Sequence, residues 1–291
     1  MSKSKRLIKD VPPKPRRHIL RNDLFILAAR IAGFFILTVA VRLGLHALLR
    51  GLFQAWNLTP QTVARAPGWA RTLYVWQGSL VTLCVDIAAT AYVLLLCRVR
   101  LPRPALQSGA VHWGVGTALA ILSAGLFLMT DSLRPEWPLS RPHLSFGLLP
   151  LWGLTLLTVL AEELFTKGVV YDTVARRWGT PQAVCAATLL FFLTNGGYSG
   201  TWISGVNVVL MGVLCAVLHA RRGLWAPVGF RWGWSFATVF LLGQGGGSHA
   251  VYRLYGVSEN LFTGGDGGLV YGLWMAAALI LLTGINVRRP R

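Results

Sequence analysis

Two adjacent glutamates, Glu162 and Glu163, lie near the end of an apolar run that begins at Leu148. An ionised carboxylate in the hydrocarbon of a bilayer is expensive, so an intramembrane acid either has a function or is neutralised by a partner. As a functional group, a buried glutamate can act as a general base toward water. As a structural group, it forms an ion pair with a nearby cation, and Lys167 follows within the same run.

The composition indicates that these glutamates lie inside a membrane protein. Hydrophobic residues make up 54% of the 291 residues and charged residues 13%, and the mean hydropathy is +0.54; a soluble domain has about a quarter of its residues charged. The net charge is +18, but the basic residues cluster in short loops between apolar runs, which argues against nucleic acid as a partner. The four cysteines lie in or beside apolar runs without a CxxC or metal-binding spacing, so we expect them to be small core residues.

Eight apolar stretches, each near the roughly 20 residues needed to span a bilayer, predict an all-α polytopic membrane helix bundle with about eight transmembrane helices. They lie at about 24–45, 74–96, 111–129, 146–167, 181–198, 204–220, 224–242 and 269–287. The chain divides accordingly into a basic, proline-containing tail (1–22), three transmembrane helices (23–143), a core segment (144–242), and an outer loop with the last helix (243–291).

The distribution of Lys and Arg predicts that the N- and C-termini are both cytosolic. With a cytosolic N-terminus, 19 basic residues fall on the inner side and seven on the outer side. The protein is then a multi-pass protein of the cell membrane, with Glu162 and Glu163 within about 10 Å of the cytosolic surface. The glycine-rich segments 243–249 and 264–268 fall outside, and because neither contains a GK[ST] motif we interpret them as flexible connections.

Few other ionisable groups lie inside the spans. Arg30 of the first span and Asp86 of the second are predicted to form a structural pair, since buried charges are usually paired; a role in transport is the alternative. No two histidines are four residues apart and the sequence has no HExxH motif, which excludes a zinc-protease site of that type. A Ser/His/Asp triad is poorly supported, because no histidine lies at the depth of the glutamates.

Three segments resemble the successive motifs of one membrane-protein family. The segment Glu162–Gly168 (EELFTKG) is similar to an EExxxR motif, Phe191–Asn195 (FFLTN) to FxxxH, and Leu224–Ser235 (LWAPVGFRWGWS) to a segment that ends in HxxxN. These are the motifs of the CAAX prenyl protease and bacteriocin-processing (CPBP, Abi) family of intramembrane endopeptidases. The resemblance covers about residues 144–242, the core segment, and implies peptide-bond hydrolysis within the membrane.

In this family a glutamate acts as general base on a water molecule, while histidines and an asparagine hold that water or a divalent metal and stabilise the oxyanion. The resemblance therefore implies a catalytic site at Glu162 and Glu163, with four residues that depart from the motifs. Lys167 stands at the arginine position, Asn195 and Arg231 at the histidine positions, and Ser235 at the asparagine position.

These departures change the chemistry that the site can support. Asparagine can donate a hydrogen bond to an oxyanion, but it cannot shuttle a proton and is a poor transition-metal ligand. Arginine binds no metal and cannot act as a base near neutral pH, so we predict no cofactor. Arg231 lies about seven residues into its span from the inner side, where we expect its guanidinium to pair with Glu162 or Glu163.

The sequence leaves three functions open. The first is a degenerate member of the family, a pseudoprotease embedded in the lipid bilayer that binds or scaffolds membrane or lipidated peptides through a cluster of Glu162, Glu163, Arg231 and Lys167. The second is an active intramembrane endopeptidase, a hydrolase in which Glu162 is the general base, Asn195 an oxyanion donor and Arg231 an electrostatic stabiliser. The third is a small transporter that uses ionisable groups of the first two spans and the glycine-rich outer loops.

Overall fold

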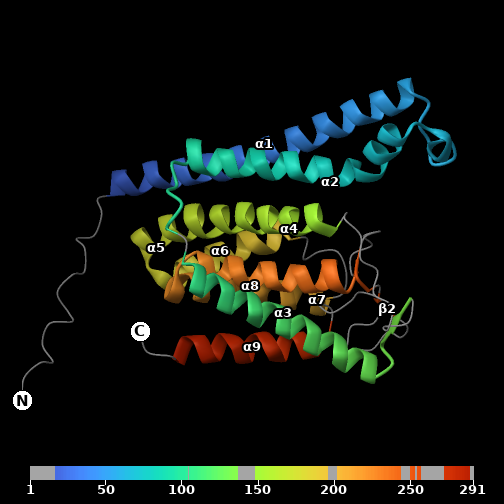
Figure 1. The fold of residues 1–291 in the computed structure, drawn as a ribbon. Helices are drawn as coiled ribbons and strands as arrows, with labels where there is room; N and C mark the ends of the chain where they lie inside the picture. Colours follow the sequence, from blue (N-terminus) through green and yellow to red (C-terminus); the bar gives the residue numbers. More distant parts are fainter. Residues whose placement is uncertain are drawn as a thin grey trace, which may run out of the picture.

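The computed structural model describes residues 17–103, 105–136, 148–195, 202–243, 250–252, 254–256 and 272–288. These residues are almost entirely helical (Figure 1), apart from a short antiparallel pairing of β1 (Leu133–Pro135) with β2 (Leu254–Gly256). The predicted all-α polytopic bundle is therefore confirmed. The glycine-rich segment 264–268 and most of 243–249 fall outside the described residues, as does the chain before Arg17.

A long helical hairpin forms one layer of the bundle (Figure 1). It consists of α1 (Arg17–Ala55) and α2 (Gly68–Ala91), which continues as a π-helical segment to Leu96. The helix α1 begins inside the stretch 1–22 that the sequence predicts as tail, because the three prolines lie before Arg17 and leave the following residues free to extend the helix. The helix α2 packs against α4, which belongs to the core of the bundle.

The remaining helices pack beneath this hairpin and carry the motif residues (Figure 1). The helix α4 passes through a π-helical segment into α5, and α8 likewise ends in a π-helical segment that reaches Leu241. The bounds are α3 Leu106–Met129, α4 Leu148–Glu163, α5 Asp172–Trp178, α6 Thr180–Thr194, α7 Trp202–Arg222, α8 Trp225–Ser235 and α9 Leu273–Arg288.

Sharp turns at one end of the bundle bring these helices back antiparallel. Gly179 (φ 93°) joins α5 to α6, and Gly223 (φ 80°) joins α7 to α8. Both residues adopt left-handed backbone conformations that favour glycine, because a Cβ atom would strain them. Each turn lets consecutive helices pack side by side, so that the polar residues of α4, α6 and α8 can meet.

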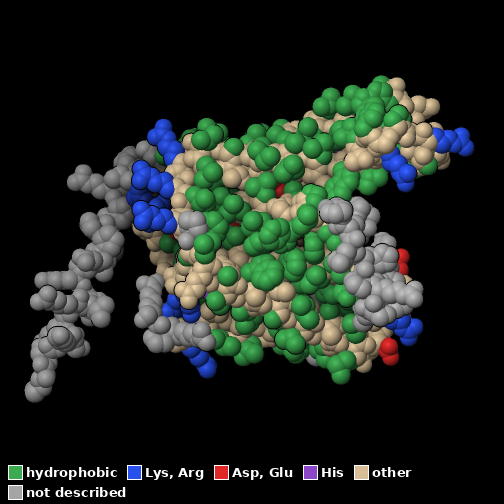
Figure 2. All heavy atoms as spheres, in the orientation of Figure 1, with side chains coloured by type: hydrophobic (Ala, Val, Ile, Leu, Met, Phe, Trp, Pro, Cys, Tyr) green, Lys and Arg blue, Asp and Glu red, His purple; other side chains and the backbone are tan. Residues whose placement is uncertain are grey.

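The surface of the bundle fits a lipid environment. Within the described residues, five helical segments are long and apolar enough to cross a bilayer, namely Asp23–Ala55, Gly68–Leu96, Leu106–Met129, Leu148–Trp178 and Trp202–Arg222. The helices α6 and α9 are apolar but shorter. Hydrophobic side chains dominate the surface between the two ends of the bundle, and Lys and Arg side chains gather at those ends (Figure 2). The start of α1 and the end of α9 lie at the same end (Figure 1).

The helices α3 and α8 approach each other closely through glycine. A Cβ atom on Gly233 would lie 2.0 Å from the carbonyl oxygen of Trp113, and one on Gly229 would lie 2.2 Å from that of Gly109. The hydroxyl of Thr117 donates a hydrogen bond to the carbonyl of Gly233 at 3.1 Å across the same crossing. Small residues of this kind allow backbone contact between membrane helices. The crossing therefore fixes the position of α8, which carries Arg231.

We predict that Gly233→Ala destabilises the protein. The new methyl group would meet a backbone oxygen rather than a movable side chain, so α3 and α8 must separate, and overpacking of this kind lowers the free energy of unfolding by about 1–3 kcal/mol. The matched control is Gly114→Ala on α3, where a Cβ atom has no neighbour within 4 Å. Thermal unfolding in detergent measures both variants, and equal shifts of the transition would contradict the prediction.

Candidate active site

The two glutamates lie at the end of α4 and point to different surroundings, since adjacent helix residues are about 100° apart. The side chain of Glu163 is 0% exposed and that of Glu162 is 25% exposed. Glu163 faces the interior of the bundle, whereas Glu162 stays partly accessible. The π-helical segment Leu164–Tyr171 follows directly, and π-helical turns are frequent at functional sites.

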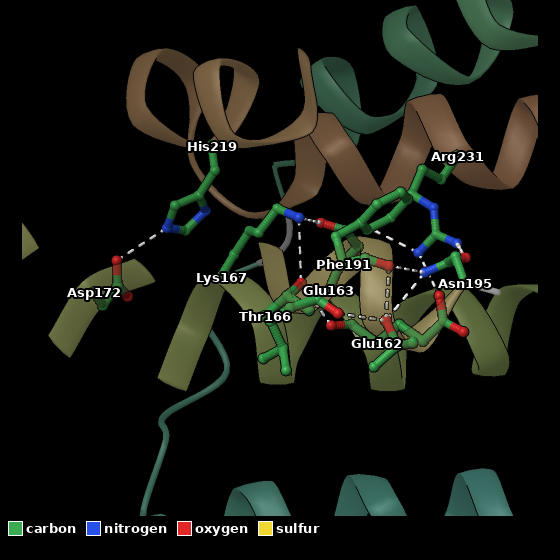
Figure 3. Close-up of polar contacts among 11 residues, drawn as sticks. Glu162, Glu163, Thr166, Lys167, Asp172, Phe191, Asn195, His219 and Arg231 are labelled. Atoms are coloured by element: carbon green, nitrogen blue, oxygen red, sulfur yellow. Dashed lines mark hydrogen bonds and ion pairs between the residues drawn. The ribbon is translucent and has the colours of Figure 1, made fainter. Parts of the chain in front are cut away.

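Arg231 of α8 lies between the two carboxylates (Figure 3). Its Nη1 atom is 2.6 Å from Oε2 of Glu162 and donates a hydrogen bond to Oε1 of Glu163 at 3.2 Å. The Arg231 side chain is 12% exposed, so these contacts are made largely away from water. The predicted pairing of Arg231 with the glutamates is present in the structure, and it joins α8 to α4.

Lys167 completes the charge balance of the site. Its Nζ atom lies 3.3 Å from Oε2 of Glu163, one helical turn earlier, and both side chains are 0% exposed. The ammonium also donates a hydrogen bond to the hydroxyl of Thr166 at 3.2 Å. Glu163 is thus held between two cations. The two carboxylates and two cations of this cluster have no net formal charge, as expected for charges that are buried together.

Asn195, immediately after α6, joins the cluster through Arg231. Its side-chain oxygen accepts a hydrogen bond from Nη2 of Arg231 at 2.9 Å, and its amide nitrogen donates to the carbonyl of Phe191 at 3.1 Å. The same amide group contacts the hydroxyl of Thr194 at 3.1 Å. Asn195 therefore orients the guanidinium and has its own hydrogen-bonding capacity largely used within the site.

The ring of Phe191, the first residue of the FxxxH-like segment, is part of the site although Phe191 is not among the predicted site residues. It lies 4.6 Å from the Arg231 guanidinium carbon and 5.0 Å from Nζ of Lys167, so both cations face one aromatic ring (Figure 3). Such contacts stabilise cations that have lost their water. The available signal was the spacing, because Phe191 precedes Asn195 by about one helical turn and therefore shares its side of α6.

Ser235 is not brought into this cluster. It lies one turn beyond Arg231 on α8, and among the described residues it makes no hydrogen bond or ion pair with the glutamates, Arg231 or Asn195. His219 also lies elsewhere, with its Nε2 atom 2.9 Å from the carboxylate of Asp172 on α5. The structure thus brings together Glu162, Glu163, Lys167, Asn195 and Arg231 of the predicted site residues.

The predicted Arg30–Asp86 pair is wrong. The hydroxyl of Tyr92 donates to the carbonyl of Arg30 at 3.0 Å, which places Arg30 level with Tyr92, whereas Asp86 lies in α2 six residues, about 9 Å, before Tyr92. Asp86 instead accepts a hydrogen bond from Thr158 of α4. Thr158 lies one turn before Glu162, so a polar contact between α2 and α4 adjoins the charge cluster.

The donor set of the cluster does not suit the divalent metal that the resemblance allows. Two cations already occupy the carboxylates, and a guanidinium stands where a neutral imidazole ligand would be needed. Across the described ranges, no three His, Cys, Asp or Glu side chains gather in a metal-binding arrangement. We therefore derive no chemistry of this site through a metal.

One family model matches the part of the chain that contains this site. Residues 144–237 match the family model described as type II CAAX prenyl endopeptidase Rce1-like. The resemblance predicted from the three motifs is thereby confirmed over about a third of the chain, the part that contains the charge cluster. No curated protein and no solved structure matches the chain.

We predict that Arg231→Ala lowers the free energy of unfolding by about 3–5 kcal/mol, because it leaves the two carboxylates with only Lys167 as a partner and so one uncompensated negative charge. The matched control is Arg177→Ala, which removes a half-buried arginine that pairs with Asp23 and should change stability by less than about 1 kcal/mol. Thermal and denaturant unfolding in detergent measure both. An Arg231→Ala protein as stable as the Arg177→Ala protein would show that the cluster is not a structural element.

Proposed function

We propose that the protein is a non-hydrolytic relative of the CAAX prenyl endopeptidases that binds membrane or lipidated peptides at the charge cluster of α4, α6 and α8. The observation that carries this proposal is the contact of one guanidinium, that of Arg231, with both glutamates. This contact pairs a permanent cation with Glu162 and Glu163, the two residues that the family resemblance marks as catalytic.

A glutamate acts as a general base when it can reach water and accept its proton. Glu163 has no exposed side-chain surface and lies between Lys167 and Arg231. Glu162 lies 2.6 Å from Arg231, so an ion pair already occupies its carboxylate. Asn195 donates to Phe191 and Thr194 within the site, so its amide is occupied rather than free to stabilise an oxyanion.

The same arrangement is suited to binding. Arg231 and Glu162 remain partly exposed, and they offer a fixed donor and a fixed acceptor within an apolar part of the bundle. A peptide backbone in the membrane needs such partners, because its amide and carbonyl groups find no water there. The cluster can therefore recognise a peptide segment without altering it.

The second candidate is the active endopeptidase. The exposure of Glu162 favours it, because 25% of this side chain is accessible, whereas the side chain of Glu163 is fully buried. In that mechanism Glu162 removes the proton of the water, and Arg231 stabilises the tetrahedral intermediate electrostatically.

A cleavage assay separates the two candidates. The purified protein is incubated in detergent with a panel of prenylated and transmembrane peptides, alongside Glu162→Gln, which keeps the shape of the side chain, and Glu162→Ala. We expect no cleavage above background by any of the three proteins, retention of labelled peptide by the wild type, and a lower unfolding temperature for Glu162→Ala, which removes a partner of Arg231. Cleavage by the wild type that Glu162→Gln abolishes would overturn the proposal in favour of the endopeptidase.

We also propose that both termini face the cytosol of a cell membrane, with Glu162 and Glu163 nearer that side. The support is the same-end position of the start of α1 and the end of α9 together with the exposed arginines there, among them Arg98, Arg100 and Arg222.

Cysteine labelling in intact cells tests this orientation. In a variant that lacks the exposed Cys185, a cysteine introduced at Arg222 should resist a membrane-impermeant maleimide, whereas one introduced at Arg71, at the other end of the bundle, should react. Permeabilised cells provide the control, since both positions should then react. The opposite labelling pattern would show the reverse orientation.

A further inference from the structure

An apolar groove runs along the bundle between α3, α4 and α8, on a face of α8 other than the one that carries Arg231. Its volume is about 500 Å³, and its walls include Leu106, Ala110, Trp113, Trp152, Trp225 and Trp232. The face of the bundle over these three helices is dominated by hydrophobic side chains (Figure 2). A groove of this kind is matched by a hydrocarbon chain rather than by a polar ligand.

Indole rings hold the walls of the groove in place. The ring of Trp232 lies 5.1 Å from that of Trp152 and 6.1 Å from that of Trp113, and its Nε1 atom donates to the carbonyl of Trp152 at 3.4 Å. The Nε1 atom of Trp113 is buried and has no hydrogen-bond partner among the described residues. The groove thus offers flat, preformed apolar walls, which suit an acyl chain.

One end of the groove adjoins a cluster of positive charge. The indole of Trp225 donates hydrogen bonds to the carbonyls of Pro102 and Arg103, at 3.2 and 3.1 Å, and so ties the connection between α2 and α3 to the groove. This connection carries three exposed arginines and no acidic residue, and its arginines are Arg98, Arg100 and Arg103. An apolar groove with a basic end is complementary to an anionic amphiphile, whose hydrocarbon chain fits the groove and whose charged group fits the basic end.

We propose that this groove is a binding site for an anionic phospholipid. One acyl chain lies against the indole walls, and the phosphate lies against Arg98, Arg100 and Arg103. Basic pockets between membrane helices recognise anionic headgroups in this way. The site does not depend on the proposed peptide-binding function, because none of the residues that line the groove belongs to the charge cluster.

Native mass spectrometry of the full-length protein tests the proposal. The wild type is presented with equal amounts of phosphatidylglycerol and phosphatidylcholine that have the same acyl chains. We expect preferential retention of phosphatidylglycerol. Replacement of the three arginines by glutamine should remove that preference. Each replacement should lower the affinity for phosphatidylglycerol by about fivefold, since each basic residue near the surface contributes about that factor. Equal retention of the two lipids by the wild type would overturn the proposal.

A groove-filling variant tests the position of the acyl chain. Ala110→Phe places a ring in the groove, and the matched control is Ala118→Phe, an exposed alanine of the same helix outside it. We expect Ala110→Phe to reduce retention of phosphatidylglycerol by more than about tenfold. Displacement of only two methylene groups of the acyl chain from the groove accounts for that factor. Ala118→Phe should bind as the wild type does. Unchanged binding by Ala110→Phe, or an equal loss in both variants, would overturn the site.

Three further measurements keep the result specific. Thermal unfolding shows that each variant is folded, and quenching of tryptophan fluorescence by brominated phosphatidylglycerol should weaken in Ala110→Phe and persist in Ala118→Phe. Capture of labelled lipidated peptide distinguishes this site from the proposed function. In Ala110→Phe, loss of phosphatidylglycerol retention with intact peptide capture supports the inference. Loss of peptide capture with intact phosphatidylglycerol retention would assign the groove to the lipid of the peptide and would overturn the inference.

Discussion

The neutralisation of two carboxylates, one fully and one partly buried, by two cations is the constraint on which the core of this bundle depends. Glu162 and Glu163 of α4, Lys167 of the following π-helical segment and Arg231 of α8 have no net charge together, but any three of them do. In the low dielectric of a membrane bundle an uncompensated charge is far more expensive than in water. The helices α4 and α8 must therefore pack in the one arrangement that brings Arg231 between the carboxylates, and Asn195 after α6 fixes the orientation of that guanidinium.

The close crossing of α3 and α8 makes this arrangement possible. Backbone contact at Gly229 and Gly233 places α8 against α3 at a distance that larger residues would forbid, and the chain can then carry Arg231 toward α4 on another side of the same helix. Apolar surface alone would not choose this packing, because lipid tails solvate such surface as well as a neighbouring helix does. Steric fit sets the distance between the helices, and the ion pairs select their rotation.

The length and hydropathy of the apolar runs were sufficient to predict the helices, since a span is recognised by composition without knowledge of its neighbours. The pairing of Arg231 with the glutamates was also predictable, because both partners could be counted in depth from the same end of the bundle. That counting failed for Arg30 and Asp86: the register of α1 on α2 depends on side-chain packing near Tyr92, which hydropathy does not report. The roles of Phe191 and Thr158 depend on helix rotation, which apolar runs without a clear polar face leave undetermined.

An arginine at the position where the similar motif has a histidine changes the kind of site that this part of the fold can maintain. An imidazole gains and loses a proton near neutral pH, so a site built on it can pass protons to a substrate and must tolerate both charge states. A guanidinium keeps its charge, so Arg231 can be buried beside two carboxylates as a constant partner but cannot take part in proton transfer. The same substitution that removes a proton carrier therefore supplies the charge that lets both glutamates remain in the membrane. Retention of the glutamate pair in this chain is explained by ion pairing and does not require hydrolysis.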